Sequence, residues 1–142
     1  MIIPDLNILI HAHNPKSSLH RKARAWWDAK LQGSEGVGLP WVVILGFIRI
    51  TTHPRILEKP LRPDAATRRI DDWLALPQVH IPAPSARHFG LLKSSLDSLG
   101  TAGNLTTDAH LACLAMERGY LLCSTDADFA RFPKLRWENP LQ

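Results

Sequence analysis

The segment Met1-Ile-Ile-Pro-Asp-Leu-Asn7 opens the chain with a short apolar run that stops at an aspartate. Residues Ile2 to Pro4 have the composition of a short buried strand, which places Asp5 at its C-terminal end. A second apolar run, Tyr120 to Cys123, leads in the same way into Ser124-Thr-Asp-Ala-Asp-Phe129. Both runs predict strands that end next to carboxylates.

Helical patterns fill much of the chain between these strands. Leu6 to Ala12 can begin a helix that Asp5 or Asn7 caps and that Asn14-Pro15 ends. The segment Trp41–Thr51 is apolar nearly all round, which favours a buried helix, although its β-branched residues also allow a strand. The remaining predicted helices run from Ser17 or Ser18 to Gly33, from Asp64 to about Leu76, from Ser85 to Gly100 with Phe89, Leu92, Leu96 and Leu99 on one face, and from Thr106 or Thr107 through Glu117 to Gly119.

Short strands at Val79–Ile81 and Leu135–Trp137 complete an alternation of strands and helices. This alternation predicts an α/β fold with three layers, α/β/α, around a central and mostly parallel sheet of roughly four to five strands. The length of 142 residues favours one domain over residues 1–142. Ligands of parallel sheets bind beyond the C-terminal ends of the strands, so we expect Asp5 and Asp126 to share one crevice.

The composition is that of an ordinary globular protein, with 45% hydrophobic and 21% charged residues. No apolar run approaches the roughly 20 residues that a membrane span requires, and Met1-Ile-Ile is too short for a signal peptide. Cys113 and Cys123 lack the spacing of a metal site, and we expect them to be reduced core residues of a cytoplasmic protein. The formal net charge of +4 moderately favours a polyanionic partner.

Four aspartates stand where predicted elements begin or end: Asp5, Asp108, Asp126 and Asp128. Asp108 opens a predicted helix, whose macrodipole tolerates a negative charge at this end. Carboxylate oxygens are natural ligands of Mg²⁺ and Mn²⁺, and carboxylates held together repel one another without a cation. Such an ion also activates water and holds a phosphate oxygen. The pattern predicts a divalent metal site, against the simpler alternative that each aspartate only caps a helix or turn.

Polar residues beside these acids are candidates for supporting roles. We expect Asn7 to hold Asp5 or a metal-bound water, unless it only begins a helix. Ser124 and Thr125 precede Asp126 and are expected to orient it, although a plain turn explains them as well.

Histidines and tryptophans are weaker candidates. His11-Ala-His13 does not predict a zinc site, because residues two apart on a helix face different ways. Trp26, Trp41 and Trp73 fit apolar helix faces better than they fit base stacking. Arginines are spread along the chain, and as a set they can form a rim that contacts an RNA backbone. They are Arg21, Arg24, Arg49, Arg55, Arg62, Arg68 and Arg69.

Three segments together resemble the PIN-domain nucleases: Asp5-Leu-Asn7, Thr107-Asp-Ala-His-Leu-Ala112 and Ser124-Thr-Asp-Ala-Asp-Phe129. More closely, the chain resembles the VapC toxins of bacterial type II toxin–antitoxin pairs. Further segments strengthen that match and extend it over essentially the whole chain, namely Gly46-Phe-Ile-Arg-Ile-Thr-Thr-His-Pro-Arg55, Gly103-Asn-Leu105, Asp128-Phe-Ala-Arg-Phe132 and Trp137-Glu-Asn-Pro-Leu141.

The resemblance implies an endoribonuclease that depends on Mg²⁺ or Mn²⁺, usually forms a homodimer and is inhibited by a VapB antitoxin. Such proteins cut structured RNA, commonly tRNA or a loop of rRNA, and thereby halt translation. By matching position, the resemblance implies metal ligands Asp5, Asp108 and Asp126, a fourth catalytic acid Asp128, and supporting residues Asn7, Ser124 and Thr125.

The chain departs from the family at one position. PIN domains usually carry a Glu-x-x-Arg pattern, which here is Gly46-Phe-Ile-Arg49. The site has one carboxylate fewer, so the number of bound metal ions is left open. Arg49 is retained, and we expect it to position the RNA.

Two other functions compete with metal-dependent RNA hydrolysis. A degenerate PIN fold that lacks its glutamate can be a non-catalytic module that binds an antitoxin or RNA. A phosphatase with Asp5 as nucleophile also places its aspartate after the first strand. Such an enzyme usually has a second acid two residues later, where this chain has Asn7.

Overall fold

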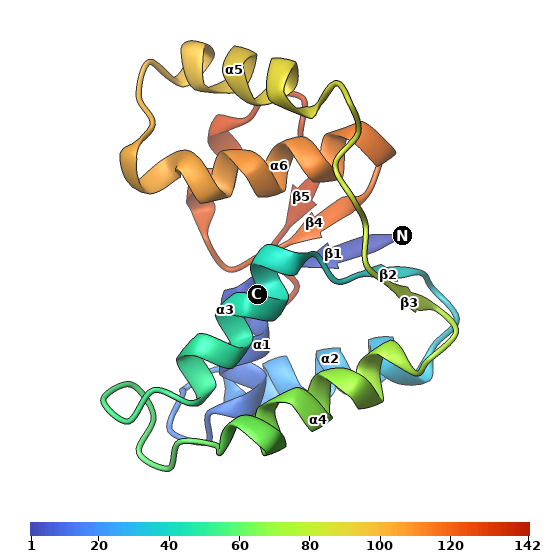
Figure 1. The fold of residues 1–142 in the computed structure, drawn as a ribbon, viewed down its shortest axis with the longest axis vertical. Coiled ribbons are helices and arrows are strands. Elements are labelled where there is room, and N and C mark those ends of the chain that lie inside the picture. Colours follow the sequence, from blue (N-terminus) through green and yellow to red (C-terminus); the bar gives the residue numbers. More distant parts are fainter.

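A computed structural model describes residues 1–142, and its centre is a sheet of five parallel strands (Figure 1). The strands are β1 Ile2–Pro4, β2 Val37–Gly38, β3 Val79–His80, β4 Leu121–Cys123 and β5 Trp137–Glu138. They lie in the order β3-β2-β1-β4-β5, so β1 occupies the middle of the sheet.

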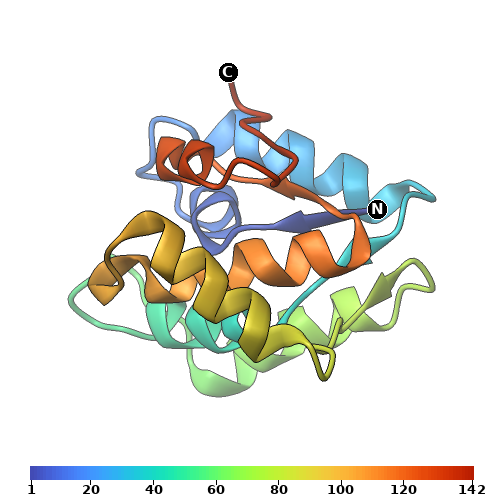
Figure 2. The same cartoon turned by 90° about the horizontal axis from the view of Figure 1, so that it is seen from above.

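Helices cover both faces of this sheet. They are α1 Leu6–His13, α2 His20–Gln32, α3 Trp41–Thr51, α4 Pro63–Leu74, α5 His88–Leu99 and α6 Thr106–Arg118, with 3₁₀ turns η1 Gly103–Leu105 and η2 Ala127–Arg131. Helices α5 and α6 pack together on one face, and α2 lies on the other (Figure 2). Helices α1 to α4 gather at the opposite end of the molecule from α5 and α6 (Figure 1). The predicted three-layer α/β/α architecture is confirmed.

The chain reverses its direction across the sheet at β1. From β1 it moves to β2 and β3 on one side, and later to β4 and β5 on the other. In parallel sheets such a reversal leaves a crevice beyond the C-terminal ends of the two strands that flank it. Here these strands are β1 and β4, which pair with Pro4 opposite Cys123. The next residues, Asp5 and Ser124, leave the sheet side by side.

The apolar core keeps the strand ends in place. Ile3 of β1 and Leu122 of β4 are completely buried, and Leu9 of α1 and Phe47 of α3 belong to the same cluster. Burying one side chain of this size contributes about 1.5–3 kcal/mol. The crevice is built on a rigid support.

Strand β2 is absent from the sequence-based assignment. Its two residues follow Gly33-Ser-Glu-Gly36 and are too few to show a strand pattern. They form a strand because β1 and β3 pair with them on either side, with Val37 opposite both Ile2 and Val79. Strand β5 begins at Trp137, where the predicted last strand ends.

Several helix caps were predicted at the wrong residues. Ser17 and Ser85 act in the turns before their helices, where each hydroxyl accepts from the backbone N–H two residues later. Helix α4 begins with Pro63, which has no N–H that a cap must satisfy. Turn η1 leads directly into α6, so a threonine cap is not needed there. The predicted capping by Asp64, Ser85, and Thr106 or Thr107 is therefore wrong, and α2 begins at His20, after the predicted start at Ser17 or Ser18.

The segment Trp41–Thr51 is a helix, as predicted, but it is not buried all round. Trp41 and Leu45 are each 59% exposed, because they lie one turn apart on the face that α1 and α4 do not cover. Trp41 therefore does not belong to the core.

Phe89 was predicted on an apolar face of α5 and is 74% exposed instead.

The two cysteines are free and buried, as predicted. None of the helices combines the length and the apolar character that crossing a membrane would require.

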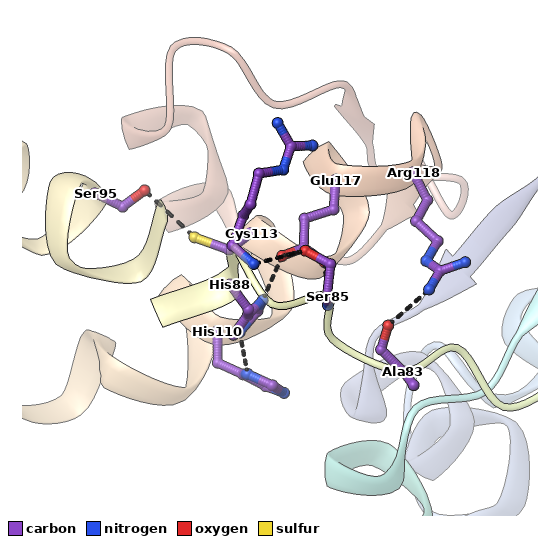
Figure 3. A network of polar contacts seen from close by, with 9 residues as sticks. Ala83, Ser85, His88, Ser95, His110, Cys113, Glu117 and Arg118 are labelled. Carbon is purple, nitrogen blue, oxygen red and sulfur yellow. Dashed lines mark hydrogen bonds and ion pairs between the residues drawn. The ribbon is translucent and has the colours of Figure 1, made fainter. Parts of the chain in front are cut away.

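A buried polar network joins α5 to α6 (Figure 3). The Glu117 carboxylate accepts hydrogen bonds from the Ser85 backbone N–H at 3.0 Å and from the Ser85 hydroxyl at 3.1 Å. His88 Nδ1 lies 3.1 Å from Glu117 Oε1, and His88 Nε2 lies 2.8 Å from Nδ1 of His110. Burial raises the pKa of Glu117, but these hydrogen bonds outweigh it and hold the pKa below its ordinary value. The network attaches the start of α5 to the helix that carries Asp108.

We predict that Glu117→Gln lowers the free energy of unfolding at pH 7 by about 1–2 kcal/mol, because an amide replaces a charged acceptor of three donors. A carboxyl whose folded pKa is depressed stabilises the fold above its unfolded pKa of about 4.5 and loses this effect as the pH falls through the folded value. Urea unfolding at pH 7 and at pH 3 measures both. The deficit should shrink at pH 3, and the exposed Glu138→Gln should cause none.

Candidate functional site

Asp5 is fixed at the point where β1 ends and α1 begins. Its Oδ1 accepts from the Leu6 backbone N–H at 2.7 Å and so caps α1, as predicted. Its Oδ2 accepts from the Ser124 hydroxyl at 2.7 Å. Its own N–H donates to the Cys123 carbonyl at 2.8 Å, which continues the pairing of β1 with β4. Both carboxylate oxygens are thus held by the fold.

Ser124 is the residue that joins the two strand ends. It is completely buried. Besides donating to Asp5, its hydroxyl accepts from the Asp126 backbone N–H at 2.9 Å and from Asn7 Nδ2 at 3.3 Å. Ser124 thus contacts the backbone of Asp126, and its predicted role in orienting the Asp126 side chain stays a prediction. Asn7 contacts Ser124 and not Asp5 directly, and its Oδ1 is buried without any hydrogen-bond partner.

Asp126 and Asp128 stand at the start of η2. Asp126 caps this turn by accepting from the Asp128 backbone N–H at 2.9 Å. Asp126 is half-buried and Asp128 is exposed. Thr125, between Ser124 and Asp126, makes no side-chain hydrogen bond, so its predicted supporting role stays a prediction.

Asp108 lies in the first turn of α6, and the charges of the other acids raise the pKa of its carboxyl group. Its pKa is raised to about 6, mainly by burial and then by the charges of Asp5, Asp126 and Asp128, in that order. Burial also raises the pKa of Asp5, against the hydrogen bonds from Ser124 and Leu6, and Asp126 adds to the rise. Four acids from three segments therefore act on one another across the crevice.

The donor set suits a divalent cation, although the side chains do not form a finished cage. No group of three or more histidine, cysteine, aspartate or glutamate side chains stands, as placed, in a position to hold a metal ion. Two observations nevertheless fit such an ion. The ionised form of Asp108 is disfavoured by its neighbours, and the buried Asn7 Oδ1 has no partner. Both favour a positive charge or a bound water here.

A pocket of about 380 Å³ opens beside two of these acids. Asp5 and Asp108 lie on its wall together with Arg49, whose side chain is exposed on α3. Asp126 and Asp128 do not line it. The remaining walls are Leu6, Val42, Val43, Leu45, Gly46, Thr107 and Leu111. In this arrangement an anion can bind to Arg49 in the pocket that Asp5 and Asp108 also line.

Leu6 occupies the space where the family's glutamate would begin. A β-carbon on Gly46 would overlap with Cδ2 of Leu6, a terminal methyl group on the facing turn of α1. An acid at position 46 would therefore require Leu6 to rotate away.

Sequence reasoning missed the apolar walls of the pocket and the network behind α6. Glu117, Cys113 and His110 recur at intervals of three to four residues, which is the spacing of one helix face. That polar stripe on an otherwise buried helix was an available signal. The contact of Leu6 with Gly46 has no signal in a single sequence, because it joins residues 40 positions apart through the fold.

We predict that Asp108→Asn stabilises the metal-free protein at neutral pH. Below about pH 4 the carboxyl is protonated in both the folded and the unfolded state. Between there and about pH 6 only the folded state keeps the proton, so the free energy of unfolding falls as the pH rises. With allowance for solvent screening, the variant should be more stable at pH 7 by roughly 1–2 kcal/mol. Unfolding in chelator at pH 4 and 7 measures this, and the exposed Asp97→Asn should track the parent protein.

Comparison with known proteins places this geometry in a family. The family described as PIN domain matches residues 2–135. Ribonuclease VapC37 of Mycobacterium tuberculosis is 40% identical over 140 residues, which cover 99% of this chain and 97% of that protein. Ribonuclease VapC33 of the same species is 40% identical over 142 residues, which cover 100% of this chain and 99% of that protein.

Solved structures share the fold at lower identity. VapBC-1 from nontypeable Haemophilus influenzae has a TM-score of 0.68 at 18% identity, over 100% of both chains. DNA-bound VapBC from Salmonella typhimurium has a TM-score of 0.67 at 21% identity, over 99% of both chains. These similarities support the PIN fold. The sequence match over nearly the whole length goes further, and the chain belongs to the PIN-domain family and, within it, to the VapC ribonucleases.

Proposed function

We propose that this chain is the toxin of a type II toxin–antitoxin pair and cleaves structured RNA as an endoribonuclease dependent on Mg²⁺ or Mn²⁺. Asp5, Asp108 and Asp126 are its proposed metal ligands, with Asp128 as a nearby fourth acid. The observation that carries the proposal is the pKa of Asp108, raised to about 6 by burial and then by the three other aspartates. A divalent cation stabilises such a cluster by replacing repulsion with attraction.

The chain's residues divide the work of hydrolysis among them. A bound divalent ion supplies Lewis acidity, which activates a water and stabilises charge that develops on a phosphate. Ser124 holds the Asp5 carboxylate and the Asp126 backbone at once, which keeps two acidic segments at a constant separation. Arg49 offers a phosphate a charged donor at the pocket wall.

RNA is the proposed substrate because relatives at 40% identity are named ribonucleases. The net charge of +4 agrees with a polyanion. Among structured RNAs we favour tRNA, with rRNA as the second candidate. Both are in the cytoplasm, where we place the protein.

Two protein partners complete the proposal. Similar folds were solved as VapBC complexes, so a VapB-type antitoxin is the proposed inhibitor. A homodimer is the proposed active form. Its candidate surfaces are α3, where Trp41 and Leu45 are exposed, and the segment from Ile56 to Leu76. Leu45 also lines the acidic pocket, so a partner on this face of α3 reaches the site.

A non-catalytic module that binds antitoxin or RNA is the alternative function. The observation that favours it is Gly46, which removes one carboxylate and is covered by Leu6. The remaining acids still raise the pKa of Asp108, so a repulsion that a cation would relieve remains without the glutamate. We therefore retain catalysis as the proposal.

We predict that purified protein cuts total tRNA in Mg²⁺ or Mn²⁺ and that chelator abolishes the cleavage. Asp5→Asn should lower the cleavage rate by on the order of 100-fold or more, because it removes a charge from the ion that acts on the transition state. The asparagine keeps an oxygen that can cap α1, so the variant should remain folded. Gel analysis of end-labelled tRNA measures the rate, and circular dichroism checks the fold.

The matched control is Asp97→Asn, which neutralises an exposed aspartate on α5 and should leave cleavage unchanged. Full activity of folded Asp5→Asn would remove Asp5 from the metal site. Tight tRNA binding without chelator-sensitive fragments from the parent protein would favour the non-catalytic module.

We further predict that Mn²⁺ raises the melting temperature of the parent protein, because the ion binds only the native cluster and relieves its repulsion. At 100 times the dissociation constant the stabilisation is about 2.7 kcal/mol, a shift of roughly 5–10 °C for a domain of this size. The double variant Asp5→Ala, Asp108→Ala should gain little. Thermal unfolding followed by circular dichroism decides this, and an equal gain in both proteins would place Mn²⁺ elsewhere.

A further inference from the structure

A second pocket, of about 370 Å³, lies where α1, α2, α3 and α4 meet. These helices form the lower part of the molecule in Figure 1. Helix α3 contributes to both pockets, with Phe47 lining this one and Gly46 lining the acidic one. The volume is within the range of small-ligand sites.

Basic and apolar side chains line this pocket together. His13, His20, Arg24, Lys59 and Arg69 line it, and Asp28 is its one acid. Asp28 lies 3.8 Å from Arg24, in an exposed pair that neutralises little. Lys59 and Arg69 have no carboxylate within ion-pair distance. The charged side chains Arg24, Lys59 and Arg69 therefore outnumber the single acid of the pocket.

The positive charges of the pocket act on His13 and disfavour its protonated form. Burial lowers the pKa of His13, and the charges of Arg69, His20 and Arg24 lower it further. Helix α1 thus ends among positive groups, as it begins among negative ones. An anion in the pocket relieves this repulsion, just as a cation relieves the repulsion of the aspartates.

The pocket also has aromatic walls with a spare donor. Trp27, Trp73 and Phe47 line it in edge-to-face contacts, with centroids 5.3 Å and 4.9 Å apart. The Trp27 indole N–H is buried and has no acceptor in the protein, which is uncommon for a tryptophan in a core. Trp73 is only half-buried, so part of its ring is available for stacking.

We propose that this basic pocket, defined by His13, Arg24, Lys59 and Arg69, binds a backbone phosphate of the RNA strand away from the cleavage point. The proposal rests on the proposed function for the identity of the polyanion. Guanidinium groups match phosphate oxygens with paired donors, and an aromatic wall beside them suits a nucleotide better than an acidic peptide.

The distance between the two pockets suits one strand. Helix α1 begins at Asp5 in the acidic pocket and ends at His13 in the basic pocket, a length of about 12 Å at 1.5 Å per residue. A strand that crosses the carboxylates can therefore reach the basic pocket within a few nucleotides. A trinucleotide bound at the acids is too short to use both sites fully.

The test compares Arg69→Gln with Arg87→Gln, which removes the same charge from an exposed residue before α5, outside this pocket. Binding of tRNA to each protein is measured in chelator as a function of salt. We expect Arg69→Gln to weaken binding about 5- to 10-fold at low salt and to reduce the slope of log K against log salt by roughly one, as the loss of one phosphate contact requires. Arg87→Gln should leave the slope unchanged.

Cleavage assays with metal give a second readout. Arg69→Gln should raise KM for tRNA by about 5- to 10-fold without changing kcat, and trinucleotide cleavage should be unaffected. Equal effects of the two arginine variants would overturn the proposal. The proposal would also be overturned if polyglutamate displaced tRNA as effectively as an RNA of equal charge does. That result would assign the pocket to an acidic protein.

The two proposals fail in different ways. A protein that never cuts RNA but shows the altered salt slope in Arg69→Gln loses the proposed catalysis and keeps the phosphate site. A protein that cuts RNA with identical slopes in both variants keeps the catalysis and loses the phosphate site.

Discussion

Parallel pairing of β1 with β4 brings acidic segments from the two ends of the chain into one crevice. The other contacts of the site depend on this pairing. Ser124 fixes the Asp5 carboxylate and the Asp126 backbone with one buried hydroxyl. Helix α6 then adds Asp108, and the pKa of this carboxyl rises to about 6 through burial and the neighbouring charges. The carboxylates remain close despite their mutual repulsion, because the apolar core beneath the strands prevents the segments from separating.

The sequence predicted the positions of the acids better than the contacts between them. Strand-end aspartates follow from apolar runs and from the rule that parallel strands share their C-terminal edge, so Asp5 and Asp126 were found. Strand β2 was not, because two residues carry no period and depend on neighbours for pairing. Helix caps failed where a serine turn, a proline or a 3₁₀ turn satisfied the first N–H groups instead. Exposure of Trp41 depends on which helices cover α3, which a single sequence does not specify.

Gly46 and Leu6 have opposing effects on how strongly the site favours a cation. The missing glutamate removes one negative charge, which lowers the repulsion that a cation must offset. Leu6 packs against Gly46 with an apolar side chain, and burial is the first cause of the raised pKa values of Asp5 and Asp108. The cluster thus still favours a cation, although it has one carboxylate fewer.

Helix α1 connects clusters of opposite charge, and its own dipole supports both. Its N-terminus carries the positive end of the macrodipole, where Asp5 stands, and its last turn carries the negative end, where His13 lies near Arg24 and Arg69. A polyanionic strand is attracted to the basic end at all times and repelled by the aspartates until a cation is bound. Asp5, Asp108 and Asp126 would hold the proposed divalent ion, which would lessen this repulsion of the strand and supply Lewis acidity at a phosphate.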